Sequence, residues 1–264
     1  MSKELIFETH AHFDDEAFAE DRHILLASMK DRGVGTVMNI GASFDSSETS
    51  LELAKQYPFV YAAVGIHPEH TETMTLDTIE RLKKMAQHPK VVAIGEIGLD
   101  YHYPDPAPEI QKEWFRRQME LAAECHLPVV IHSREAARDT LEILKEFAGR
   151  GPELKGSMHC FSYSAEVALE VIRLGYSIGI GGVITFKNAR KLVEALEVLP
   201  LEKILLETDC PYMAPEPHRG KRNNSGYLPL IASKIAEYKG VPVEEVIRIT
   251  RENAERIFIQ QNRK

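Results

Sequence analysis

The sequence predicts an α/β fold, a (β/α)8 barrel of the TIM type. Short β-branched apolar runs recur along the 264 residues, and stretches with helical periodicity lie between them. The runs are continuously apolar, which is typical of parallel strands covered on both faces. About eight strand–helix units fit the length at which a single (β/α)8 barrel closes.

The expected strands share this β-branched, apolar character. In order they are Leu5–Phe7, Thr36–Ile40, Val60–Val64, Val91–Ile94, Val129–Ile131, Gly156–Met158, Tyr176–Ile180 and Ile204–Leu206. A doubly wound open sheet is the competing architecture. It is disfavoured because no G-x-G-x-x-G follows the first strand, and because the number of units is closer to closure.

Amphipathic stretches fill the intervals between these strands. One helical face consists of Val167, Ala168, Val171 and Ile172, and another of Ile110, Trp114, Leu121, Ala122 and Cys125. The last helix begins behind Pro242 and carries apolar side chains from Val243 to Phe258. No shift in composition and no Ser/Gly-rich linker interrupts the chain, so we expect one domain, residues 1–264.

Composition excludes several classes of protein. Hydrophobic residues make up 44% and charged residues 27%, as in ordinary globular enzymes. Lys and Arg number 32 against 40 Asp and Glu, so the net charge is −8, which disfavours wrapping of duplex DNA. The longest apolar run, Tyr176 to Phe186, is far shorter than the ~20 residues of a membrane span.

The expected location is the cytoplasm. Met1 to His12 carries Glu4, Glu8 and two histidines, where a signal peptide would be apolar. The three cysteines, an odd number in a long chain, fit a reducing compartment better than a disulfide framework.

Potential metal ligands recur at the carboxyl ends of the expected strands, where barrels place their active sites. His10 and His12 end the first strand and point to the same side of it. Four further candidates follow later strands, namely Glu96, His132, His159 and Asp209. Buried imidazoles and carboxylates need partners, which metal ions supply together, so we expect all six side chains to bind metal.

The size of this set bears on the number of ions. Four imidazoles and two carboxylates exceed the three protein ligands of one open catalytic site. Two divalent ions ~3.5–4 Å apart, sharing a carboxylate, fit better. The donors are borderline in softness, which suits Zn²⁺, Mn²⁺, Ni²⁺ or Co²⁺, with Mg²⁺ possible if waters complete its shell.

Over essentially its whole length the chain resembles the TatD family of metal-dependent DNases, a branch of the amidohydrolase-like barrels. The motifs that carry the resemblance occur in the same order. They are THAHFD around His10, VGIHPE at Val64–Glu69, IGEIGLDYH at Ile94–His102, IHSREA at Ile131–Ala136, HCFS at His159–Ser162, ETDCPYMAP at Glu207–Pro215 and RGKRN at Arg219–Asn223.

The resemblance implies roles for the metal ligands. His10, His12 and Asp209 would bind one ion, His132 and His159 the other, and Glu96 would bridge the two. One segment departs from the family pattern. Members often continue RGKRN with an acidic residue and proline, whereas this chain reads Asn223-Asn224-Ser225-Gly226, which leaves the substrate contacts of this loop open.

Further residues are candidates for catalysis and substrate binding. Asp209 would be ligand and proton acceptor at once, and Glu96 would act with it. His67 follows the third strand, faces the barrel mouth and could donate to a phosphate oxygen. Phosphate or substrate contacts are also expected at His102, Arg134, Arg219, Lys221 and Arg222. The alternative for the 219–222 cluster is a solvated loop.

The predicted function is hydrolysis of DNA phosphodiester bonds by a water activated between two divalent metal ions. The 3′–5′ direction and the preference for single strands come from the resemblance. DNA, as a single strand or an end, is the expected partner, with no membrane and no obligate protein partner. Two alternatives stay open. The same site could hydrolyse an ester, lactone or amide, or the chain could be a catalytically silent metal-dependent binding protein.

Overall fold

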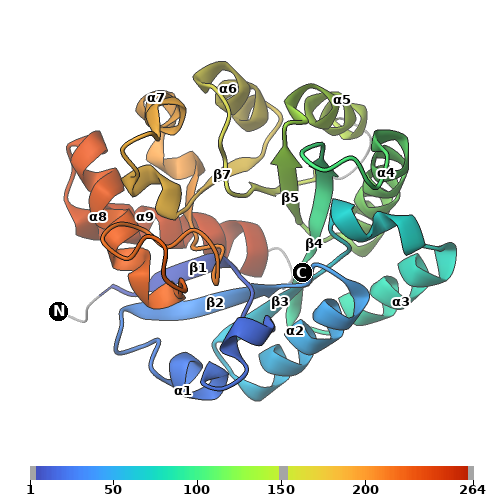
Figure 1. The fold of residues 1–264 in the computed structure, drawn as a ribbon, viewed down its shortest axis with the longest axis horizontal. Helices are drawn as coiled ribbons and strands as arrows, with labels where there is room; N and C mark the ends of the chain where they lie inside the picture. Colours follow the sequence, from blue (N-terminus) through green and yellow to red (C-terminus); the bar gives the residue numbers. More distant parts are fainter. Residues whose placement is uncertain (1–3, 149–153, 261–264) are drawn as a thin grey trace.

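The structure, a computed structural model, describes residues 4–148 and 154–260. In this part of the chain, eight parallel strands form one sheet whose spatial order is the sequence order. The strands are β1 (Ile6–Ala11), β2 (Val34–Ile40), β3 (Val60–Val64), β4 (Val91–Asp100), β5 (Val129–Arg134), β6 (Gly156–Met158), β7 (Ser177–Ile180) and β8 (Ile204–Leu206). The strands occupy the centre and the helices form an outer ring (Figure 1). The predicted barrel is confirmed.

The barrel closes between β1 and the segment that follows β8. Ala11 forms an isolated parallel bridge with Cys210. The Asp209 N–H donates to the carbonyl of His10 (2.9 Å), and the His12 N–H donates to the carbonyl of Cys210 (2.8 Å). Closure therefore places His10, His12 and Asp209 side by side and excludes the open-sheet alternative.

All eight expected strands are present, but three extend beyond the carboxyl ends of their apolar runs. β1, β4 and β5 continue through polar residues, so His10, Glu96 and His132 lie within strands rather than after them. The pairing of β4 with β5 is irregular between Ile94 and Ile97. Such a bulge re-aims a side chain, and here it falls at Glu96.

Helices connect the strands on the outside of the barrel. They are α1 (Arg22–Ala27), α2 (Phe44–Gln56), α3 (Leu76–Ala86), α4 (Pro108–Cys125), α5 (Ala137–Phe147), α6 (Ala165–Arg173), α7 (Arg190–Val198), α8 (Leu228–Lys239) and α9 (Val243–Ala254). No helix in the described residues is both long and apolar enough to cross a membrane.

The predicted buried face of α4 is partly wrong. Ile110 is exposed, and Trp114 and Cys125 are only half-buried. The buried face includes Phe115 and Met119. It also includes Gln111 and Gln118, whose side-chain amides hydrogen-bond to the backbone of Asp100 and Ile66, a burial that apolar periodicity does not reveal.

The core has two parts. The larger part lies between the strands and the surrounding helices. The smaller part joins strand residues such as Phe7, Met38 and Val130 to Ile257 and Phe258 near the end of the chain. The predicted last helix is thus confirmed, and the turns after α9 supply apolar side chains to this second cluster.

Candidate active site

Four donor atoms from three segments converge on one point. The Nε2 atoms of His10 and His12 lie 3.1 Å apart. Glu96 Oε2 is 3.3 Å from His10 Nε2 and 3.7 Å from His12 Nε2. Asp209 Oδ1 is 3.6 Å and 3.5 Å from the same two nitrogens.

These separations fit a metal ion. Ligands bound to a tetrahedral centre at 2.0–2.1 Å are about 3.3 Å apart, and the five distances above scatter around that value. A single proton shared between the His10 and His12 nitrogens would leave the two carboxylates poorly satisfied. A divalent cation would satisfy all four donors, so the side chains in place fit the group.

A second set of donor atoms lies near the other carboxylate oxygen of Glu96. Its Oε1 is 2.8 Å from His132 Nδ1 and 2.6 Å from His159 Nε2, and these two nitrogens are 3.0 Å apart. His10, His12 and Glu96 form one group able to hold a metal, and Glu96, His132 and His159 form another. Glu96 therefore faces both donor sets, one oxygen to each.

Contacts outside the cluster determine which nitrogen of two histidines faces it. His12 Nδ1 lies 2.9 Å from the Ile40 carbonyl, to which it must donate, so Nε2 is the nitrogen that faces the cluster. His132 Nε2 lies 2.9 Å from Asp100 Oδ2, which leaves Nδ1 toward Glu96. Such outer partners orient metal-binding imidazoles.

Asp100 is itself held in place. Its N–H donates to the side-chain oxygen of Gln111 (2.8 Å), whose amide nitrogen donates to the Asp100 carbonyl (2.8 Å). The His102 N–H donates to Asp100 Oδ1 (2.9 Å). Helix α4 thus fixes the carboxylate that orients His132.

The pKa values of the clustered side chains reflect this crowding. Burial tends to raise the pKa of Glu96, but the charges of His159, His10 and His67 hold it well below its usual range. Burial tends to lower the pKa of His12 and His132. Hydrogen bonds and charges from carboxylates outweigh it, and raise the pKa of His12 to about 10 and that of His132 to about 9.

Two buried carboxyl groups lie behind the ligands. Glu8 accepts hydrogen bonds from the N–H groups of His10 (3.1 Å) and Thr208 (2.9 Å), and burial raises its pKa to about 7. Glu207 accepts from the Cys160 N–H (2.5 Å), next to His159, and burial raises its pKa well above the usual range. These carboxyls hydrogen-bond to the segments that carry the candidate ligands.

A cavity of about 520 Å³ opens onto the cluster. His67, Arg134, Tyr103 and Tyr212 line it together with the donor residues. The two tyrosines are 49% and 54% exposed. The opening is within the size range of small-ligand sites.

His67 is placed to donate a hydrogen bond into this cavity. Its Nδ1 accepts from the Glu69 N–H (3.3 Å), so Nε2 carries the proton. That atom lies 3.6 Å from Glu96 Oε1. Burial and the charge of His132 lower the pKa of His67 to about 3, so the ring is neutral near pH 7.

The basic loop after β8 does not converge with these residues. Arg222 forms an ion pair with Asp21 (2.5 Å) and stacks over Phe18. Arg219 lies over the ring of Phe186, 4.3 Å from its centroid. Arg219, Lys221 and Arg222 do not line the described cavities.

His102 does not line these cavities either, and its Nδ1 lies 2.9 Å from Glu135 Oε1. Contact of these four side chains with substrate stays a prediction.

Sequence reasoning missed four residues around the site. Asp100 lies in the IGEIGLDYH motif and Glu207 in the ETDCPYMAP motif, but neither was predicted to be a site residue. Tyr103 and Tyr212 were not singled out. A carboxylate four residues beyond Glu96 on the same strand, and another two residues before Asp209, were the available signals.

The parallel barrel and the His, Glu and Asp cluster at its mouth define a metal-dependent hydrolase. Comparison with known proteins identifies the family. The profile of the TatD related DNase family matches residues 7–259. The chain belongs to the TatD related DNase family.

Individual relatives agree with this assignment. The chain is similar to an uncharacterized metal-dependent hydrolase, YabD, of Bacillus subtilis, with 42% identity over 96% of this chain and 99% of the relative. It is 32% identical to the 3′-5′ ssDNA/RNA exonuclease TatD of Erwinia tasmaniensis, over 96% of this chain and 99% of that relative. The crystal structure of YJJV, a TatD homologue from Escherichia coli, superposes with a TM-score of 0.91 and 33% identity, over 98% and 99%.

Proposed function

We propose that this enzyme removes nucleotides from the 3′ end of single-stranded DNA with two divalent metal ions. One observation carries the proposal: Glu96 directs one oxygen to the His10–His12–Asp209 set and the other to the His132–His159 set. A carboxylate placed in this way can bridge two divalent ions of the kind that catalyse phosphodiester hydrolysis. The relative named as a 3′-5′ ssDNA/RNA exonuclease supports the direction and the strand preference.

Within the proposal, the six side chains would hold the metals in the two sets described, and residues 1–264 would act as one barrel in the cytoplasm. When bound, a metal pair supplies Lewis-acid polarisation of the phosphate and acidification of a nearby water. Zn²⁺, Mn²⁺, Ni²⁺, Co²⁺ and Mg²⁺ are the candidates.

This chain's own residues would then perform four tasks. The Asp209 carboxylate accepts the proton of the attacking water. His67 donates from Nε2 to a phosphate oxygen, because its Nδ1 is occupied by the Glu69 N–H. Arg134, exposed at the rim of the cavity, pairs with phosphate. Tyr103 and Tyr212 offer ring faces on which bases stack.

A substrate panel tests the proposal. Metal-dependent release of mononucleotides from end-labelled single-stranded DNA is compared with hydrolysis of RNA, simple phosphodiesters, esters, lactones and amides. Release from the 3′ end of DNA, faster than turnover of carbonyl substrates, is expected. Preferential turnover of a lactone, ester or amide would replace the proposal, and no turnover of any substrate by the metal-loaded protein would make it a binding protein.

The Asp209→Asn variant tests the proton acceptor. An amide can coordinate a metal through oxygen but cannot take the proton, so kcat on single-stranded DNA should fall at least ~100-fold. DNA binding under saturating metal should persist. Asp31→Asn, at an exposed position, is the matched control. Turnover within about threefold of wild type, with metal content retained, would remove Asp209 from this role.

A further inference from the structure

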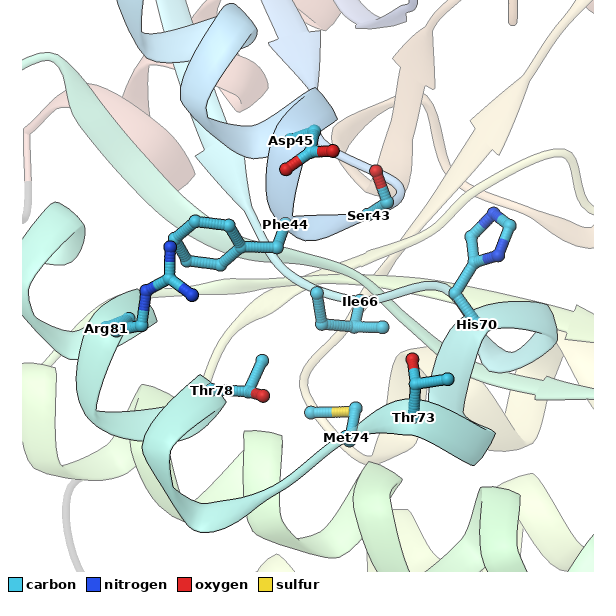
Figure 2. Close-up of a pocket in the computed structure, with 9 residues that line it drawn as sticks. All are labelled: Ser43, Phe44, Asp45, Ile66, His70, Thr73, Met74, Thr78 and Arg81. Carbon is cyan, nitrogen blue, oxygen red and sulfur yellow. The ribbon is translucent and has the colours of Figure 1, made fainter.

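A second cavity, with a volume of about 370 Å³, opens beside the cluster of candidate metal ligands. We call it the Arg81 groove. Its lining consists of Ser43, Phe44, Asp45, Ile66, His70, Thr73, Met74, Thr78 and Arg81. Figure 2 shows Ser43 and Asp45 on one wall and Thr73, Met74 and Thr78 on the other, with the Arg81 guanidinium over the Phe44 ring.

The groove adjoins the cavity over the candidate metal ligands. Ser43 and His70 line both of them. The groove lies between the segments that follow β2 and β3. A third cavity, which includes Phe161, Val183 and Met213, adjoins the cluster from the segments that follow β5 to β8. In a barrel with strands in sequence order, these two extensions lie on different sides of the cluster.

Arg81 is the cation of this groove. It is exposed, and its guanidinium carbon lies 3.6 Å from the centroid of the Phe44 ring. Among the described residues no carboxylate lies within ion-pair distance of it, whereas Lys83 on the same helix pairs with Glu124 at 2.8 Å. The ring holds the guanidinium by a cation–π contact and leaves its N–H edge available to an anion.

We propose that the Arg81 groove binds a phosphate of the substrate strand other than the one being cleaved. Arg81 pairs with that phosphate, and Phe44 positions the guanidinium. A strand attached to the scissile phosphate must leave the metal cluster along one of the cavities that adjoin it. The Arg81 groove offers an unpaired cation and three hydroxyl side chains, Ser43, Thr73 and Thr78, which suit a phosphate backbone. This inference rests on the proposed nuclease function.

Asp45 carries the charge opposite to that of Arg81 and so allows a second test. Its exposed carboxylate lines the groove and would repel a strand phosphate. Removal of the positive charge at Arg81 and of the negative charge at Asp45 should therefore act in opposite directions. With a cationic ligand, loss of the Arg81 charge would strengthen binding and loss of the Asp45 charge would weaken it.

The test compares Arg81→Ala with Lys84→Ala, which removes the same charge from an exposed position of α3 outside the groove. Substrates are single-stranded oligonucleotides of increasing length and a nucleotide nitrophenyl ester that carries a single phosphate. Arg81→Ala should raise KM for the longer oligonucleotides roughly threefold to tenfold. It should leave kcat, and both constants for the nitrophenyl ester, unchanged. Lys84→Ala should match wild type throughout.

Three further measurements separate pairing with phosphate from a structural effect. The slope of log KM against log salt concentration should decrease by about 0.7 in Arg81→Ala, as expected for one lost contact with a single strand. Asp45→Asn should lower KM for the same oligonucleotides, and Arg81→Lys should fall between wild type and Arg81→Ala.

Three results would overturn the inference. In the first, Arg81→Ala and Lys84→Ala have the same KM for the oligonucleotides. In the second, Arg81→Ala raises KM for the nitrophenyl ester as much as for the oligonucleotides. In the third, Arg81→Ala lowers KM and Asp45→Asn raises it. If wild type cleaves no oligonucleotide, the proposed function fails separately. The groove is then tested by anisotropy of a fluorescent oligonucleotide on metal-loaded protein, where Arg81→Ala must still weaken binding.

Discussion

Glu96 and the partners of its histidines determine what the site can hold. Each oxygen of Glu96 faces a different pair of imidazoles. The Ile40 carbonyl and the Asp100 carboxylate orient His12 and His132. The donor atoms are thereby preorganised, so metal binding costs little side-chain ordering.

Asp100→Ala should lower metal affinity about tenfold to hundredfold, because His132 loses the acceptor that fixes its ring. The affinity is measured by competition with a chromogenic chelator, and circular dichroism checks the fold. Asp100→Asn, which keeps an oxygen acceptor, should lose less. Asp31→Ala, at an exposed position, should bind metal as wild type does. An affinity within twofold of wild type in Asp100→Ala would contradict the orienting role.

Metal binding should release protons and strengthen as pH rises. The raised pKa values of His12 (about 10) and His132 (about 9) mean that both rings are protonated near pH 7 without metal. An imidazole must be neutral to bind a metal. Loading should therefore release about two protons, and affinity should rise about tenfold per pH unit for each proton until the pKa is passed. Calorimetry in buffers of different ionisation enthalpy measures the release, and a value near zero would contradict the coupling.

At the scale of elements, helix α4 positions the loops that carry the site. The side-chain oxygen of Gln118 accepts from the Ile66 N–H (2.8 Å), and its nitrogen donates to the Ile66 carbonyl (3.0 Å), directly before His67. Gln111 holds the backbone of Asp100 in the same way. Buried amides that satisfy loop backbone groups keep those loops in a single conformation.

The end of β7 allows a test of this packing. A Cβ added at Gly179 would lie 2.1 Å from Glu207 Oε2, whereas at Gly181 the nearest atom is 3.7 Å away. Gly179→Ala should lower the free energy of unfolding by about 1–3 kcal/mol. It should also lower metal affinity, because Glu207 contacts the Cys160 N–H beside His159.

Gly181→Ala is the matched control, and its free energy of unfolding should stay within about 0.5 kcal/mol of wild type. Chemical denaturation and metal competition supply the two measurements. Equal effects of the two substitutions would show that Glu207 does not transmit packing to the metal site.

At the scale of the whole molecule, the net charge of −8 opposes broad contact with nucleic acid. Positive charge around the cavities is confined to a few side chains, such as Arg134 and Arg81. Under the proposed function, we expect the protein to bind a strand through a few phosphates near the reacting end.

The salt dependence of DNA cleavage should therefore be modest. With about two or three phosphate contacts, each contributing a slope of about 0.7, a fourfold rise in monovalent salt should raise KM roughly sevenfold to twentyfold. Steady-state kinetics on single-stranded DNA at fixed metal concentration measures this slope. A rise of about a thousandfold would instead indicate the extended electrostatic interface of a duplex-binding protein.

The sequence predicted the strands more reliably than the helix faces. The eight apolar runs match β1 to β8 because parallel strands covered on both faces must be apolar throughout. The face of α4 was predicted less well, since Gln111 and Gln118 are buried by hydrogen bonds to residues beyond the helix. The six candidate ligands do lie together, because closure of the barrel brings the strand ends to one mouth.

By itself the sequence determined the barrel, the family and the set of side chains at its mouth. These follow from local patterns: the period of the apolar residues and the donor residues at the strand ends. Only the tertiary structure decided that Asp100 orients His132, that Arg222 pairs with Asp21 and that Arg81 lies unpaired over Phe44. Those relations join residues far apart in the chain, and they depend on side-chain direction and on competing partners, neither of which a local pattern encodes.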